Sequence, residues 1–247
     1  MKHTDKLYED LRALGIQNGD TVLVHTSIKG LQKEGLTASE VIDALLIAVG
    51  DGTLLVPALS YLSVTKDTPL FDVANTKTCI GVVPEVFRTT YATHRSVHPT
   101  HSVCAKGRLA ASITAAHKLD KTPVGEHSPF RLLVTVGGKI LMLGCGLKPN
   151  TFMHGVEEAA EASYPLLKET VAYTITDKNT TYNKNYYPHE FGSLIQRYDR
   201  LEGLLAEPYL VKGNALNGTA YLIDAAKAME VATIAIRKND DFFVDEQ

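Results

Sequence analysis

The sequence has no tryptophan, only three cysteines, and no apolar run of the roughly 18 residues that a bilayer-spanning helix needs. Cys79, Cys104 and Cys145 are odd in number and lack the spacing of a disulfide framework, so we expect reduced thiols. The first segment, "MKHTDKLYEDLRALG", is acidic and amphipathic, unlike a signal peptide. These absences argue against a disulfide-rich secreted scaffold. They predict a cytoplasmic protein with no membrane partner.

The sequence also lacks an excess of charge of either sign. It carries 25 Lys and Arg against 28 Asp and Glu, for a formal net charge of -3 at pH 7. A nucleic-acid-binding domain usually shows a strongly basic surface, which this balance does not provide. We therefore expect a small-molecule substrate and no nucleic acid partner. The slight acidity favours cationic small molecules only weakly.

What the sequence does contain is an alternation of strand and helix patterns over 247 residues, 45% of them hydrophobic. Short apolar runs typical of strands inside a covered sheet are "TVLVH" (21–25), "TLLVPAL" (53–59) and "KILMLGC" (139–145). Thr37 and Glu40 form a capping box in front of the apolar helix "ASEVIDALLIAV". The pattern predicts an α/β architecture with helices on both faces of the sheet, in a single domain spanning residues 1–247.

The rest of the chain continues this alternation. The patterns predict a helix around 82–91, a helix capped by Ser128 with Pro129 at its first position, a helix near 151–162, a strand at 170–176, a polar segment to about 190, a strand near 217–223 and a final helix from Asp224.

The stretch "THRSVHPTHSVCAKG" (93–107) concentrates His94, His98 and His101 in one short segment. Two histidines four apart on a helix share a face, but Pro99 directly follows His98 and disfavours helical backbone there. The remaining ligands of the usual zinc signatures are also missing nearby. We therefore predict no metal site. A metal-dependent hydrolase built on the three histidines stays an alternative, as does a polar loop whose histidines bond to backbone or water.

The stretch "LMLGCGLKPNTFMHGVEEAAE" reads as a strand, a short loop and a helix capped by Asn150 or Thr151. His154 then lies in the first helical turn, with Glu157 and Glu158 three and four residues later, the spacings that bring helical side chains together. A carboxylate there can orient the imidazole and stabilise its protonated form. An ordinary helical His–Glu contact is the alternative. The position of His154 beside a strand end favours a catalytic role, because open α/β sheets bind ligands there.

Four ordered blocks resemble the antibiotic N-acetyltransferase family typified by aminoglycoside 3-N-acetyltransferases. They are "VLVHTSIKGL" (22–31), "RSVHPTHSVCAKG" (95–107), "GEHSPFRLL" (125–133) and "LMLGCGLKPNTFMHGVEE" (141–158). The likeness covers most of the chain. It implies a three-layer α/β/α sandwich with a mostly parallel or mixed sheet, distinct from the GCN5-like acetyltransferases. It also implies an N-acetyltransferase of antibiotic resistance, with acetyl-CoA as cosubstrate and the 3-amino group of an aminoglycoside as acceptor.

The resemblance assigns the catalytic base to His154 and its partner carboxylate to Glu157. An alkyl amine has a pKa of about 10 and is mostly protonated at pH 7, so its attack on a thioester needs a base. A histidine with a pKa of about 6.5, raised by a neighbouring carboxylate, suits that task.

The resemblance assigns coenzyme binding to His25, Thr26 and Ser27, at the end of the first strand, and to Ser102. Small hydroxyls and free backbone amides at such turns can hold a pyrophosphate or a pantetheine amide. It makes the histidine-rich loop one wall of the cosubstrate cleft. Cys145 is an alternative acyl-carrying nucleophile, although a small buried thiol fits its place at a strand end better.

Departures from the family pattern bear on the acceptor. Gly155 directly follows His154, where the family has a larger residue, and is expected to loosen or open the first helical turn. The segment 176–190 is mixed in charge and rich in tyrosine, and not the acidic cluster expected for a polycation. The acceptor stays open among an aminoglycoside, another amino sugar and a small amine. A non-catalytic binding protein is a further alternative, and a homodimer is expected from base rates alone.

Overall fold

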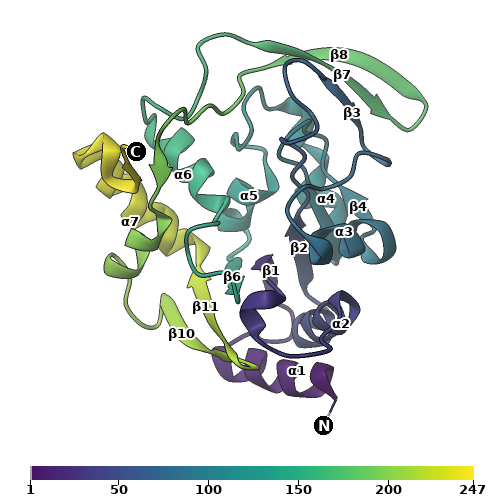
Figure 1. The fold of residues 1–247 in the computed structure, drawn as a ribbon, viewed down its shortest axis with the longest axis vertical. Helices are drawn as coiled ribbons and strands as arrows, with labels where there is room; N and C mark the ends of the chain where they lie inside the picture. The colour runs from purple at the N-terminus through teal and green to yellow at the C-terminus, as the bar shows by residue number, and fades with distance from the viewer. Residues whose placement is uncertain (1) are drawn as a thin grey trace.

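The protein, described by a computed structural model over residues 2–247, is built on a seven-stranded sheet in the order β10-β11-β6-β1-β2-β5-β4 (Figure 1). Its strands are β1 (Thr21–Thr26), β2 (Thr53–Pro57), β4 (His94–Arg95), β5 (Val103–Gly107), β6 (Lys139–Leu143), β10 (Leu210–Ala215) and β11 (Gly218–Asp224). The central strands β6, β1 and β2 run parallel. The outer strands pair antiparallel on both sides, so the sheet is mixed.

Helices cover both faces of this sheet. One side carries α1 (His3–Leu14), α2 (Ala38–Val49) and α3 (Val82–Val86), which runs on into a π-helical turn, Phe87–Tyr91. The other side carries α4 (Ala110–Ala115), α5 (Pro129–Thr135), α6 (Phe152–Ala160) and α7 (Ala225–Lys238). In β1, Val22 and Val24 pack in one core cluster and Leu23 in the other. The fully covered strand therefore confirms the three-layer α/β/α prediction.

Several helices begin at the residues that the sequence predicts as caps. Thr37 Oγ1 accepts a hydrogen bond from Glu40 N at 3.2 Å, and Glu40 Oε2 accepts one from Thr37 N at 2.9 Å, which completes the capping box. Ser128 caps α5 and Asp224 caps α7. The helix α6 behaves differently. Thr151 precedes it in helical geometry and makes no capping hydrogen bond, so a side-chain cap at this end was a wrong prediction.

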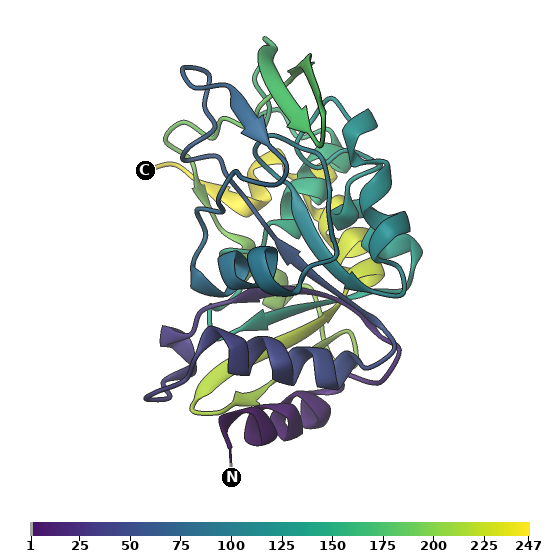
Figure 2. The same ribbon diagram turned by 90° about the vertical axis from the view of Figure 1, so that its right-hand side faces the viewer.

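A second, three-stranded sheet has the order β3-β7-β8. Its strands are β3 (Leu70–Asp72), β7 (Val171–Asp177) and β8 (Thr180–Tyr186). Both views place it at the end of the molecule opposite α1 (Figure 1, Figure 2). The predicted polar segment to about 190 contains a strand that the sequence analysis did not predict, β8, which pairs with β7 along its whole length. Its buried Tyr186 joins a cluster with Phe71 and Tyr173, while Asn and Lys side chains occupy intervening positions.

Two short strands, β9 (Ile195–Gln196) and β12 (Val244–Asp245), pair antiparallel near the end of the chain. No helix within residues 2–247 has both the length and the apolar character needed to cross a bilayer.

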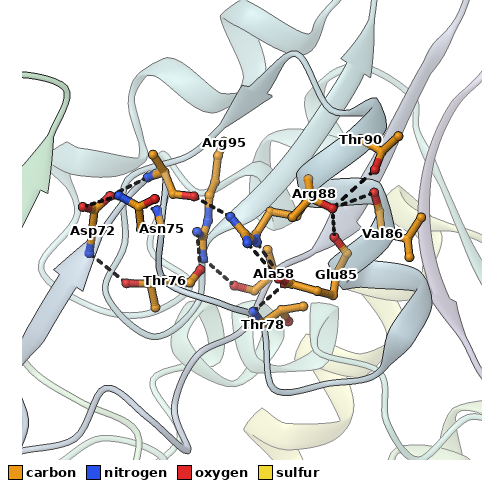
Figure 3. A network of polar contacts seen from close by, with 12 residues as sticks. Ala58, Asp72, Asn75, Thr76, Thr78, Glu85, Val86, Arg88, Thr90 and Arg95 are labelled. Atoms are coloured by element: carbon orange, nitrogen blue, oxygen red, sulfur yellow. Dashed lines mark hydrogen bonds and ion pairs between the residues drawn. The ribbon is translucent and has the colours of Figure 1, made fainter.

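Arg95 holds the segment between β2 and α3 in place (Figure 3). Its guanidinium donates hydrogen bonds to the backbone oxygens of Val73 (2.9 Å) and Thr76 (2.7 Å) and to Ser102 Oγ (3.0 Å). Ser102 in turn donates to Ala58 O at 2.8 Å. Burial lowers the pKa of Arg95 to about 10, which still leaves it charged at neutral pH. The network fastens this segment to the edge of the main sheet.

The histidine-rich loop between β4 and β5 is mostly core. His98 is 1% exposed, and its Nδ1 accepts a hydrogen bond from the backbone N of His101 at 3.0 Å. Its ring stacks on that of His117, with 5.1 Å between centroids. Ser96 Oγ contacts His117 Nδ1 at 2.8 Å. Through this backbone contact, His98 orders the turn that contains Pro99.

We expect the free energy of unfolding to fall as the pH drops below about 6.5. Burial lowers the pKa of His25 and His117 to about 3, and that of His98 well below its usual value. The unfolded chain binds protons on these residues near pH 6.5, whereas the folded chain does not. Their contribution to stability is therefore complete above this pH and is lost progressively toward the folded-state pKa. Each residue accounts for about 1.4 kcal/mol per pH unit.

Urea unfolding at about pH 7 and about pH 5.5 measures this slope. His117→Gln should reduce the slope by about one histidine's share, whereas the same change at the exposed His94 should not alter it. Equal free energies of unfolding at the two pH values would contradict the prediction.

Candidate active site

A cavity of about 850 Å³ opens where β1 ends. Its floor comes from the turn after β1 (25–29) and from the turn between β6 and α6 (145–151). The start of α3 (80–84) and the segment that Arg95 fastens form one wall. Residues 189–198, which follow β8, form another. The cavity thus lies beside the carboxyl ends of parallel strands, the usual ligand site of open α/β sheets.

His154 lines this cavity from the first turn of α6, and its side chain is 14% exposed. Its Nδ1 lies 3.0 Å from Glu157 Oε2, as the spacing predicts. The Tyr198 hydroxyl lies 2.9 Å from the same nitrogen. Glu157 itself is fully buried and accepts hydrogen bonds from the hydroxyls of Tyr198 and Tyr164, each 2.9 Å from Oε1. With Nδ1 held in this way, Nε2 is the nitrogen available to accept a proton.

The two tyrosines serve Glu157 as hydrogen-bond donors. Burial, reinforced by the charge of Glu157, raises the pKa of Tyr198 well above its usual value, and it raises that of Tyr164 in the same direction. Both hydroxyls therefore stay protonated at neutral pH. Hydrogen bonds to an ionised carboxylate offset part of the free energy that burying its charge requires.

Glu158 pairs with a different histidine. Its Oε1 lies 2.8 Å from His189 Nε2 and accepts a hydrogen bond from Val124 N at 2.9 Å. Burial raises the pKa of Glu158 to about 7 and lowers that of His189 well below its usual value. Of the two acids that follow His154 in sequence, the structure thus places Glu157 against its imidazole. No local pattern in the sequence singles out His189, Tyr164 or Tyr198. His189 and Tyr198 contact Glu158 and Glu157 from more than 30 positions away, and Tyr164 lies beyond the end of α6.

The residues at the end of β1 lie at the cavity, as the sequence predicts. His25 Nε2 accepts a hydrogen bond from the backbone N of Thr151 at 3.0 Å, so a neutral imidazole supports the start of α6. Ser27 Oγ accepts one from Gly30 N at 3.3 Å. Thr26 Oγ1 is buried without a hydrogen-bond partner among the described residues.

Asn150 and Ser102 do not have the roles that the sequence analysis predicts for them. Asn150 is no helix cap. It is fully buried, lines the cavity, and finds no partner within residues 2–247 for either its side-chain oxygen or its nitrogen. Such atoms need hydrogen bonds, so Asn150 is suited to hold a polar ligand. Ser102 is not among the cavity-lining residues, and its hydroxyl bonds to Ala58 and Arg95 instead.

Cys145 is a poor nucleophile in this position. Its Sγ lies 3.5 Å from His25 O, and burial raises the pKa of the thiol to about 12. A thiol with this pKa is protonated at neutral pH, and the thiolate is the reactive form. The structure therefore favours a half-buried, unreactive thiol over the acyl-carrying nucleophile.

Gly155 does not open the cavity, contrary to expectation. It is buried on the side of α6 that faces α5, and a Cβ there would lie 2.8 Å from Val124 Cγ1 and 3.0 Å from Arg131 Cγ. The missing side chain thus allows close packing behind His154 and leaves the first turn of α6 helical.

The three histidines of the 93–107 loop do not gather into a metal site. His94 is exposed on β4, and His98 stacks on His117. Only His101 of the three lines the cavity. The ligand set of the alternative hydrolase was therefore wrong. In the described chain, the group of three side chains with ligand atoms close together is His101, His154 and His189.

Comparisons with known proteins agree with this geometry. The family model for aminoglycoside 3-N-acetyltransferase matches residues 23–236. The aminoglycoside N(3)-acetyltransferase III of Serratia marcescens is 33% identical over 177 residues, which cover 65% of this chain and 65% of that protein. The aminoglycoside N(3)-acetyltransferase VII of Streptomyces paromomycinus is 33% identical over 175 residues, or 64% of this chain and 60% of that protein. The chain thus spans less than two thirds of these relatives.

Solved structures match more of the chain. AAC-IIIb, in a binary complex with CoASH, superposes with a TM-score of 0.82 at 28% identity, over 95% of this chain and 96% of that one. This likeness confirms the predicted fold class. Because the family model accounts for most of the sequence, the chain belongs to the aminoglycoside 3-N-acetyltransferase family.

Proposed function

We propose that this protein transfers the acetyl group of acetyl-CoA to an amine, with the 3-amino group of an aminoglycoside as the first candidate acceptor. The observation that carries the proposal is His154, which faces a cavity of about 850 Å³ with its Nδ1 held by Glu157 and Tyr198. The names of the relatives and the CoASH complex of AAC-IIIb support both substrates. Acetylation converts a protonated amine into a neutral amide, so it removes one positive charge from such an acceptor.

In the proposed reaction, the amine nitrogen of the acceptor attacks the thioester carbonyl, and Nε2 of His154 accepts the proton that this nitrogen loses. The new C–N bond forms and the C–S bond breaks. The coenzyme leaves as a thiolate and takes up the proton held by the His154 imidazolium, which regenerates the base. Glu157 acts on the imidazole by fixing its Nδ1–H tautomer and stabilising the imidazolium. A base of this kind contributes about 10²- to 10⁴-fold in rate.

We place the coenzyme along the end of β1 and the turn before α6. Thr26 Oγ1 and the side-chain amide of Asn150 lack partners among the described residues, and pantetheine carries amides that match both. Lys29 and Lys148 line the same cavity and suit the coenzyme phosphates. His25 and Ser27 order these turns. Ser102 does not touch the coenzyme in this placement. Its hydroxyl bonds to Arg95 and Ala58 and so supports the cavity wall.

One observation favours a second acceptor class, an amino sugar or small amine with fewer charges. No Asp or Glu is among the described residues that line the cavity, whereas two lysines are. A polycation gains most where acidic side chains face it, because opposite charges attract strongly at short range. The cytoplasmic location and the homodimer expected from the sequence also remain proposals.

We expect the purified protein to release free thiol from acetyl-CoA when a suitable amine is added. A panel of aminoglycosides, amino sugars and simple amines separates the two acceptor classes. His154→Gln should lower kcat by about 10²- to 10⁴-fold with little change in the KM for acetyl-CoA, because the base acts in the chemical step. Thiol release and the mass of the acetylated product measure these effects.

The control for this experiment is His94→Gln, on an exposed histidine outside the cavity. It should retain full activity. A folded His154→Gln protein with unchanged kcat would rule out the assigned base. Binding of CoASH without turnover of any amine would instead favour a non-catalytic binding protein.

Tyr198 and Tyr164 offer a matched pair, because both donate to Glu157 but only Tyr198 also reaches His154. We expect Tyr198→Phe to lower kcat about tenfold, in line with the effect of residues that orient a reactive imidazole. Tyr164→Phe should lower it by less than about threefold. The pH profile of kcat should shift in the first variant only. Equal losses in both variants would show that the contact with His154 has no separate role.

A further inference from the structure

We propose that His101, His154 and His189 form a Zn²⁺ site inside the cavity, and that Zn²⁺ bound there inhibits acetyl transfer. The metal site is independent of the proposed function, whereas the inhibition rests on it.

The geometry of the three rings is the first support. Each histidine offers a ring nitrogen, and these nitrogens lie within 4.8 Å of one another. The ring centroids are 5.8 Å apart for His101 and His154, 5.0 Å for His101 and His189, and 4.8 Å for His154 and His189. Three imidazoles plus one open position is a common arrangement around zinc.

The outer contacts of His154 and His189, each to a carboxylate, match those of metal-bound histidines. His154 Nδ1 contacts Glu157, His189 Nε2 contacts Glu158, and His101 Nδ1 contacts the hydroxyl of Thr100 at 2.9 Å. Histidine ligands almost always bond through the second nitrogen to a carboxylate, carbonyl or water, which fixes the ring and raises its basicity. In each residue the other nitrogen is therefore left for a ligand: Nε2 of His101, Nε2 of His154 and Nδ1 of His189.

An independent observation points to a ligand at this place. The side chain of His189 is only 5% exposed, and its buried Nδ1 has no hydrogen-bond partner within residues 2–247. A buried polar atom without a hydrogen bond destabilises the folded state, so His189 Nδ1 is suited to a ligand. A metal ion would satisfy its lone pair.

Metal binding requires a small closure of the site. Zn–N bonds of about 2.0 to 2.1 Å at tetrahedral angles place nitrogens about 3.3 Å apart. The ring nitrogens lie within 4.8 Å of one another, so the separations have to shorten by up to roughly 1.5 Å. His189 lies in the segment after β8, and a β-bridge to Leu166 holds its backbone, so the closure falls mainly on side-chain torsions.

Inhibition follows from the identity of one ligand. The Nε2 lone pair of His154 that would bind Zn²⁺ is the one that accepts the proton of the amine. One lone pair cannot do both, so the metal-bound protein has no free base. The fourth coordination position faces the cavity and is open to water.

The test begins with binding to the metal-free protein in the absence of substrates. We expect one Zn²⁺ per chain by isothermal titration calorimetry. With Co²⁺ as a spectroscopic probe, we expect the intense visible absorption of a four- or five-coordinate site. His189→Ala and His101→Ala should each weaken Zn²⁺ binding by about 100-fold, and Glu158→Gln by about tenfold. His94→Ala and His127→Ala are matched controls outside the cluster and should bind as the unaltered protein does.

Melting of the metal-free variants separates loss of a ligand from loss of the fold, and the more conservative His189→Gln replaces His189→Ala if the latter unfolds. Unchanged Zn²⁺ binding in the His101 and His189 variants, or equal weakening in the two controls, would overturn the site. So would the absence of stoichiometric binding.

Activity supplies the second readout. Zn²⁺ should inhibit thiol release reversibly, with recovery on adding a chelator, and His189→Gln should need at least tenfold more Zn²⁺ for the same inhibition. Stoichiometric binding without inhibition would overturn the inhibitory role and leave the site intact. If no amine is acetylated, the binding data still decide the metal site, so its failure and that of the proposed function are distinguishable.

Discussion

The candidate site depends on how one buried carboxylate is satisfied. Glu157 has no exposed surface, and burying its charge without partners would cost several kcal/mol. Its partners come from three places: His154 on the same helix, Tyr164 just beyond that helix, and Tyr198 in the 3₁₀ helix Tyr198–Gly203. The hydrogen bonds that stabilise the carboxylate therefore also fix the imidazole. They also hold Tyr198, which is distant in sequence, at the cavity.

Two acidic side chains lie behind the histidines that line the cavity. Glu157 contacts His154 and Glu158 contacts His189, and neither acid lines the cavity itself. Apart from histidine, the only charged side chains among the described lining residues are Lys29 and Lys148. The surface that a substrate meets is therefore neutral to basic. This character suits an anionic coenzyme more directly than a polycationic acceptor.

The block "RSVHPTHSVCAKG" illustrates how a family-like motif divides between structure and site. Arg95 and Ser102 fasten the β2–α3 segment, and His98 orders the turn that contains Pro99. His101 is the member of the block that reaches the cavity. Buried polar side chains of this kind position a wall because each must find its hydrogen-bond partners in one arrangement.

The sequence by itself determined what depends on near neighbours. Covered strands, the caps at Thr37, Ser128 and Asp224, and the pairing of His154 with Glu157 follow from apolar runs and helical spacing, which act over a few residues. Only the tertiary structure decided the rest. Tyr198 reaches Glu157 across 41 positions and His154 across 44, and the strand β8 exists through its pairing with β7. No local pattern encodes such contacts, because they form only when packing of the two faces brings the segments together.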